Sequence, residues 1–155
     1  MALVAPLLCV IMIGSVELGN FFYNEHILTK AVRDGARFAA RQNFSYYESG
    51  GNCANPTDAT LLANVRALVR KSLLSGSDRF PDIQDSEITL STVCTATVSG
   101  QNMSGIYAGR TGGVAGAPVV TVAASIDYTP VIGAFGFRGI GLKLNARQQA
   151  AVMGI

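Results

Sequence analysis

The chain has 155 residues, enough for one domain of ordinary size and a membrane anchor. Hydrophobic residues make up 49% of it and charged residues 14%, and the net charge of +2 comes without a concentrated basic run. This balance excludes a typical nucleic-acid-binding protein and is expected where part of the surface meets lipid or other subunits.

The N-terminal run, residues 1–24, is the most apolar part of the chain, and Glu17 is its one charge. About 20 such residues cross a bilayer core, so residues 2–24 are predicted to contact membrane lipid as a transmembrane helix. Pro6 lies about one turn inside its start, where a missing N–H is tolerated. A carboxylate in such a helix is costly. Glu17 is therefore expected to pair with a terminal amine or basic side chain of a neighbouring subunit, or to lie in contact with water near the outer interface.

The helical pattern continues without a stop signal to Gln42, and residues 25–42 form an amphipathic half. One helix over residues 2–42 would be about 60 Å long, twice the hydrocarbon thickness, so this half would project from the membrane. Small residues recur in it at four-residue spacing, namely Ala31, Gly35 and Ala39, and such a series permits close approach. Packing on the chain's own sheet and contact with other helices in a bundle both remain open.

Residues 43–155 are predicted to form one globular α+β domain. After a loop that ends near Pro56, a helix is expected over residues 58–75, with Thr57 or Asp58 as its cap and Gly76 after its end. Arg66, Arg70 and Lys71 are expected on its solvated side. Its predicted buried face consists of Leu61, Leu62, Val65, Leu68, Val69 and Leu73.

The period of the apolar residues then changes from 3.6 to 2, which predicts a small antiparallel sheet of about three strands, over residues 87–98, 119–128 and 141–153. The inward faces are expected to carry Ile88, Leu90, Cys94 and Val98, then Val120, Val122, Ala124, Ile126 and Tyr128, then Leu142, Leu144, Ala146, Ala150 and Val152.

Two connections between these strands are rich in glycine. Residues 99–118 are expected to be a flexible loop or one that covers a neighbouring molecule. Residues 129–141 keep apolar side chains among the glycines. This second connection is expected to touch the membrane surface, touch another subunit, or fold over the chain's own core.

The three cysteines bear on the cellular compartment. Cys9 lies in the apolar run, where an unpaired thiol behaves as a small hydrophobe. Cys53 and Cys94 lie in the domain that follows, and we expect them to form a disulfide in an oxidising compartment; two separate buried thiols are the alternative. Neither a CxxC motif nor clustered histidines occur, so no metal site is predicted.

The orientation signals conflict. Lys30, Arg33, Arg37 and Arg41 follow the apolar run and would place the domain in the cytosol by the positive-inside rule. The expected disulfide indicates export instead. We expect an exported domain, with a basic leader encoded before Met1.

No catalytic, cofactor-binding or metal residues are predicted, and the chain is not expected to be an enzyme. His26 stands at the membrane boundary, and Asp82, Asp85 and Asp127 have no nucleophile motif beside them. Gly136, Gly139 and Gly141 precede a predicted strand rather than a helix, so they do not form a dinucleotide-binding motif.

Residues 2–42, ALVAPLLCVIMIGSVELGNFFYNEHILTKAVRDGARFAARQ, combine a proline in an apolar stretch, an acidic step (Glu17 to Gly19) and AVRDGARFA (Ala31 to Ala39). This sequence is similar to the N-terminal segment of TadE-like pseudopilins of the tight-adherence (type IVc) pilus system. The last predicted strand pair, around the T-P and glycine-rich connection, also resembles that family. The assembly residues that we expect in the N-terminal helix are Pro6, Glu17, Gly19, Ala31, Gly35 and Ala39.

The resemblance implies a bacterial inner-membrane protein with a periplasmic or extracellular domain, or a subunit of a surface filament. Its implied partners are a prepilin peptidase, other pilin-like subunits and the pilus assembly platform. We therefore expect a structural minor pilin or pseudopilin that packs through its N-terminal helix. The alternative is a single-pass, membrane-anchored envelope domain that binds a ligand or partner through its glycine-rich loop, residues 99–118.

Overall fold

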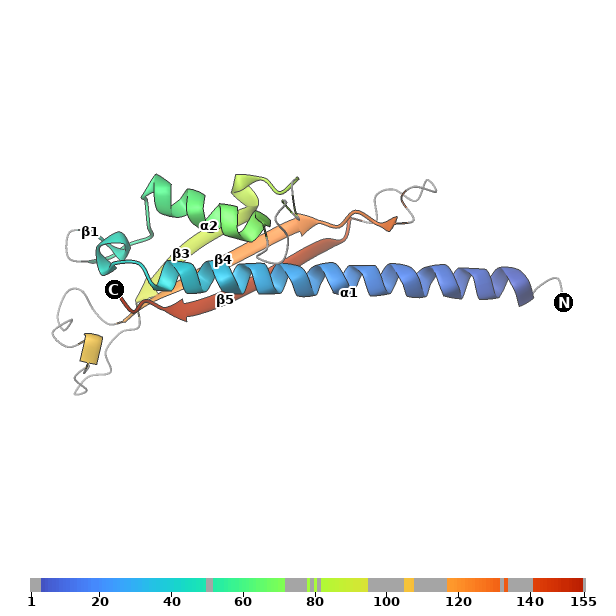
Figure 1. Ribbon diagram of the computed structural model, residues 1–155, viewed down its shortest axis with the longest axis horizontal. Helices are drawn as coiled ribbons and strands as arrows, with labels where there is room; N and C mark the ends of the chain where they lie inside the picture. Colours follow the sequence, from blue (N-terminus) through green and yellow to red (C-terminus); the bar gives the residue numbers. More distant parts are fainter. Residues whose placement is uncertain are drawn as a thin grey trace.

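The computed structural model describes residues 4–49, 52–71, 78, 80, 82–94, 105–107, 117–131, 133 and 141–154. One long helix, α1 (Val4–Ala40), runs the length of the molecule, and the remaining elements gather along its C-terminal part (Figure 1). These are a second helix, α2 (Ala59–Lys71), and a three-stranded antiparallel sheet of β3 (Ile88–Cys94), β4 (Pro118–Asp127) and β5 (Lys143–Ala151). The predicted α+β fold is confirmed.

Strand β4 is the central strand of the sheet, in the order β3-β4-β5. It runs from the C-terminal end of α1 back toward the middle of that helix (Figure 1). The predicted alternation holds, because Val120, Val122, Ala124 and Ile126 are all buried. Leu142 was predicted to point inward, but it precedes the first residue of β5 and is 45% exposed.

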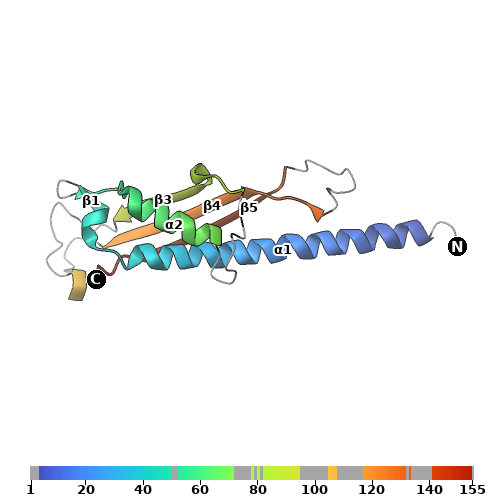
Figure 2. The same cartoon turned by 45° about the horizontal axis from the view of Figure 1, so that its top comes forward.

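Helices α1 and α2 lie side by side against the inward face of the sheet (Figure 2). Gly35 is the point of closest approach, since a Cβ built there would lie 3.2 Å from Val69 Cγ2 and 3.6 Å from Val65 Cγ1. A larger side chain would push α2 away from α1. The small residues of α1 thus allow it to pack within its own domain.

Helix α2 begins as the sequence predicts, with Asp58 as its cap: the Leu61 backbone N–H donates to Asp58 Oδ1 over 2.7 Å. Of the predicted buried face, Leu61, Val65 and Val69 are buried. The predicted end at Gly76 lies outside the described residues.

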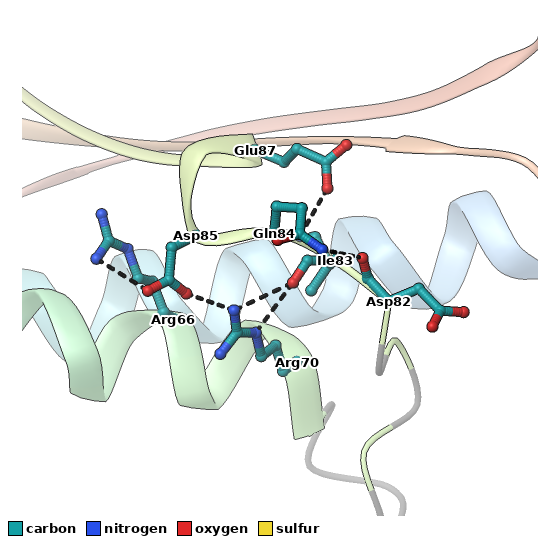
Figure 3. Close-up of polar contacts among 7 residues, drawn as sticks. All are labelled: Arg66, Arg70, Asp82, Ile83, Gln84, Asp85 and Glu87. Atoms are coloured by element: carbon teal, nitrogen blue, oxygen red, sulfur yellow. Dashed lines mark hydrogen bonds and ion pairs between the residues drawn. The ribbon is translucent and has the colours of Figure 1, made fainter.

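The solvated side predicted for α2 needs a correction. Arg66 and Arg70 both form ion pairs with Asp85 of the 3-10 helix η2 (Asp85–Glu87), and Arg70 also donates to the Ile83 carbonyl over 3.1 Å (Figure 3). The two guanidinium side chains are only 29% and 32% exposed. Lys71 is exposed as predicted. For the two arginines the prediction needs correcting because η2 folds back over this side of α2, which helical periodicity within α2 cannot indicate.

The end of α1 farthest from the N-terminus is tied to several later segments. The Met153 backbone N–H donates to the Ala40 carbonyl over 2.7 Å, so the C-terminal residues lie beside the end of α1. Gly154 has a φ of 55°, and a Cβ there would overlap the ring of Phe44. Glycine is required at this position both for its backbone conformation and for space.

The segment after α1 was predicted as a loop but contains regular structure. A 3-10 helix, η1 (Phe44–Tyr47), leads into a short hairpin of β1 (Glu48–Ser49) and β2 (Asn52–Cys53). Tyr47 is fully buried and its hydroxyl donates to the Ala39 carbonyl over 2.5 Å. Burial raises the pKa of Tyr47 to about 12.

A disulfide joins Cys53 of β2 to Cys94 at the end of β3, with 5.9 Å between the two Cα atoms. It connects the hairpin to the edge strand of the sheet across a sequence separation of 41 residues. Cys9 is a free thiol exposed on α1.

Of the residue 99–118 connection, the described part consists of 117–118 and the 3-10 helix η3 (Gly105–Tyr107). The Tyr107 hydroxyl donates to the Val152 carbonyl over 2.7 Å, and its ring contacts Phe44 edge to face. This contact places η3 beside the C-terminal residues.

Candidate functional site

The N-terminal part of α1 extends beyond the domain as an exposed apolar rod. Every residue from Val4 to Val16 is exposed. Among the described residues, α1 is the one helix long and apolar enough to cross a membrane. The large apolar side chains exposed on this rod are Val4, Leu7, Leu8, Val10, Ile11, Met12, Ile13 and Val16.

Glu17 marks the point where the domain first touches the helix. Its Oε1 accepts a hydrogen bond from the Tyr128 hydroxyl over 2.5 Å and another from the Val131 backbone N–H over 3.2 Å. Both donors lie at the end of β4, more than 110 residues away in sequence. The sequence predicted a partner in another subunit or contact with water; in the structure, Glu17 has partners within its own chain.

Further polar and aromatic contacts surround this junction. Asn20 Nδ2 donates to Tyr128 Oη over 2.8 Å, and the Phe21 ring meets the Tyr128 ring edge to face at 5.2 Å. Burial raises the pKa of Tyr128, and its hydrogen bond to the Glu17 carboxylate raises it further. The tyrosine therefore stays neutral and acts as a donor to Glu17.

The remaining residues predicted for assembly fall into two groups. Ala31, Gly35 and Ala39 are buried against the chain's own domain. The sequence left open whether they pack on the chain's own sheet or against other helices in a bundle, and in the structure they pack within the chain. Pro6 and Gly19 are exposed, and among the described residues no atom comes within 4 Å of a Cβ built at Gly19.

The polar residues considered for chemistry are spread over separate contacts. His26 is exposed on α1, Asp85 pairs with the two arginines of α2, and Asp127 pairs with Lys143 over 3.0 Å. Asp82 and Asp127 line a cavity of about 180 Å³ beside Tyr128. No group of three potential metal ligands occurs among the described residues.

The N-terminal helix can be compared with known families now that its geometry is described. Residues 1–37 match the family model for TadE-like protein. This match confirms the predicted TadE-like resemblance over most of α1. Together with the exposed apolar helix, the TadE-like match fits a membrane-anchored protein associated with the Tad pilus. No curated protein and no solved structure matches the chain significantly.

Sequence reasoning singled out Glu17 but missed the residues that hold it. Tyr128 was predicted as an inward residue of a strand, and Val131 as part of an apolar connection. Neither carries a local signal for contact with α1, because the contact arises only when β4 folds back along the TadE-like helix. The apolar environment of Glu17 was the one available clue that it needed a partner.

Proposed function

We propose that this chain is a structural minor pilin or pseudopilin that packs through α1 with other pilin-like subunits, in a type IV-like pilus or its envelope assembly platform. The single observation that carries the proposal is the exposed apolar rod, Val4 to Val16, on a helix that matches the TadE-like family. An apolar surface of this length needs lipid or other helices around it. The role is mechanical rather than catalytic.

Lipid and a bundle of other helices are environments of similar free energy for such a rod. Lipid tails are as apolar as leucine side chains, so helix association in a membrane depends on close packing rather than on removal of water. A subunit could therefore pass from the bilayer into a bundle of equivalent helices at small cost. Gly19 supports close packing, since its outward surface is open.

We also propose that the domain lies on the exported side of the bacterial inner membrane, after cleavage by a prepilin peptidase. The Cys53–Cys94 disulfide supports this orientation because disulfides persist in oxidising compartments. The basic residues that follow the apolar rod, Arg33, Arg37 and Arg41, are exposed on the surface of the domain.

The packing proposal is tested by Gly19→Leu, with Val10→Leu as the matched control. Both changes add apolar bulk at exposed positions of α1, but only the first fills an open, small-residue surface. We expect Gly19→Leu to reduce the amount of subunit in sheared filament fractions or in complexes with pilus components. Val10→Leu should leave that amount unchanged. Equal incorporation of both variants would contradict packing at Gly19.

The location of the unaltered protein separates the proposal from its alternative. A chain found only in washed membranes, never co-purifying with pilus components, would favour the single-pass envelope domain instead.

A role of Glu17 in setting the axial register of subunits has its own test. Glu17→Gln retains a carbonyl oxygen that can accept from Tyr128 and Val131. If the charge also pairs with a neighbour's amine, Glu17→Gln should lose incorporation although it lowers the free energy of unfolding of the domain by less than Glu17→Ala does. Unchanged incorporation of both Glu17→Gln and Glu17→Ala would reject the register role.

A further inference from the structure

The apolar surface of α1 continues past the point where the domain begins. Leu18, Phe22 and Tyr23 lie beyond Glu17 in sequence and are 55%, 57% and 60% exposed. The exposed positions after them turn polar, with His26 and Lys30. Tyrosine is enriched at the boundary between lipid and water, so Tyr23, with Phe22 beside it, indicates that the membrane interface lies at this level.

The end of β4 reaches below this level. It is bound to Glu17 through Tyr128 and Val131, and Glu17 lies six residues before Tyr23. At a rise of 1.5 Å per residue this separation is about 9 Å along the helix, or about 8 Å along the membrane normal at the average tilt of about 20°. The domain therefore cannot stay wholly above the interface while Phe22 and Tyr23 lie in it.

The surface at this edge is suited to lipid. Val131 is 51% exposed and Leu142 is 45% exposed, and the two lie at the same end of the sheet because the Tyr128 N–H donates to the Leu142 carbonyl over 2.8 Å. The adjacent charges, Asp127 and Lys143, form an ion pair with each other. The charged heads of such side chains stay in water or among polar headgroups.

We propose that this membrane edge, Val131 and Leu142, inserts into the interfacial layer of the bilayer, so that the domain rests on the lipid surface rather than standing away from it. In the alternative arrangement the membrane interface lies at Val16, and Leu18, Phe22 and Tyr23 are in water. Removing large apolar side chains from water is favourable, so the arrangement that keeps Leu18, Phe22 and Tyr23 in lipid is favoured.

The chain contains no tryptophan, so a single introduced tryptophan reports on its own surroundings. The full chain carrying Val131→Trp, and separately Leu142→Trp, is reconstituted into phosphatidylcholine–phosphatidylglycerol vesicles with brominated acyl chains. Val93→Trp is the matched negative control, since Val93 is 62% exposed and pairs with Val119 at the far end of β4. Ile11→Trp on the apolar rod is the positive control.

We expect Val131→Trp and Leu142→Trp to lose roughly half of their emission to the brominated lipid, as interfacial groups lie about 5–10 Å into the headgroup–acyl boundary. Val93→Trp should lose none. Quenching of Ile11→Trp while both edge variants behave as Val93→Trp does would overturn the proposal. Blue-shifted emission that brominated lipid does not quench would also overturn it, because a neighbouring protein would then cover the edge.

Discussion

The two ends of α1 are made of equally helical sequence but meet different surroundings. From Val4 to Val16 the helix carries large apolar side chains, all exposed, whereas from Ile27 to Ala40 its buried side is mostly small and lies under the sheet and α2. Large apolar side chains suit a helix surrounded by lipid, and small ones allow neighbouring elements such as a sheet and a second helix to approach closely. Glu17 stands between these two parts, so the change of side-chain size is also a change of environment.

The largest expected effect concerns only the domain. Removing the disulfide with Cys53→Ala and Cys94→Ala together should lower the free energy of unfolding by about 4 kcal/mol, because the unfolded chain regains the freedom of a loop of about 40 residues. Chemical denaturation of the purified full chain measures this. Cys9→Ala, on the exposed rod, is the matched control and should leave the free energy of unfolding unchanged. Equal losses for the double variant and for Cys9→Ala would mean that the disulfide does not stabilise the domain.

The next effect compares two glycines of α1 directly. Gly35→Leu should lower the free energy of unfolding by about 3 kcal/mol, because the new side chain must displace Val65 and Val69. Gly19→Leu should not lower it, since the space around Gly19 is open. Thermal unfolding followed by circular dichroism tests both. A destabilised Gly19→Leu domain would show that this part of α1 also packs inside the chain.

Tyr47 provides a smaller effect with a pH signature. Tyr47→Phe should lower the free energy of unfolding by about 1.5 kcal/mol at neutral pH, because the buried hydrogen bond from the Tyr47 hydroxyl to the Ala39 carbonyl is lost and leaves the Gln42 N–H as the donor to that carbonyl. The pKa of Tyr47 is raised from 10.0 to about 12 in the folded chain, so the neutral form is favoured there. The stability from this shift is fully present below pH 10 and is lost as the pH rises toward 12.

Stability measured across that alkaline range checks the assignment. The unaltered chain should lose stability more steeply than Tyr47→Phe, whose remaining alkaline loss would include that of Tyr128. Parallel curves for the two proteins would refute the assignment to Tyr47.

The smallest expected effect lies at the junction. Glu17→Ala should lower the free energy of unfolding by about 1 kcal/mol, since Tyr128 and Val131 lose their acceptor while remaining partly accessible to water. Glu17→Gln should lower it less, because its carbonyl oxygen still accepts. Hydrogen exchange at the Val131 amide measures the local loosening. Equal exchange in all three proteins would mean that the junction does not hold the edge of the domain.

Local patterns in the sequence determined the elements of this protein. The apolar run and its continuation predicted α1, the Asp58 cap and 3.6-residue period predicted the start of α2, and the alternation from Val120 to Ile126 predicted β4. These patterns are local because backbone hydrogen bonding within a helix and the two sides of a strand involve residues that are near in sequence.

Which polar groups contact one another depends on how the chain folds back on itself. The carboxylate of Glu17 binds Tyr128 and Val131 because β4 returns along α1, and the arginines of α2 meet Asp85 because η2 folds over them. Likewise, the sequence allowed Ala31, Gly35 and Ala39 to pack against other helices or within the domain; in the structure they are buried within the domain, where α2 approaches Gly35 closely. Such contacts depend on the path of the chain between distant segments, which no periodicity within one segment encodes.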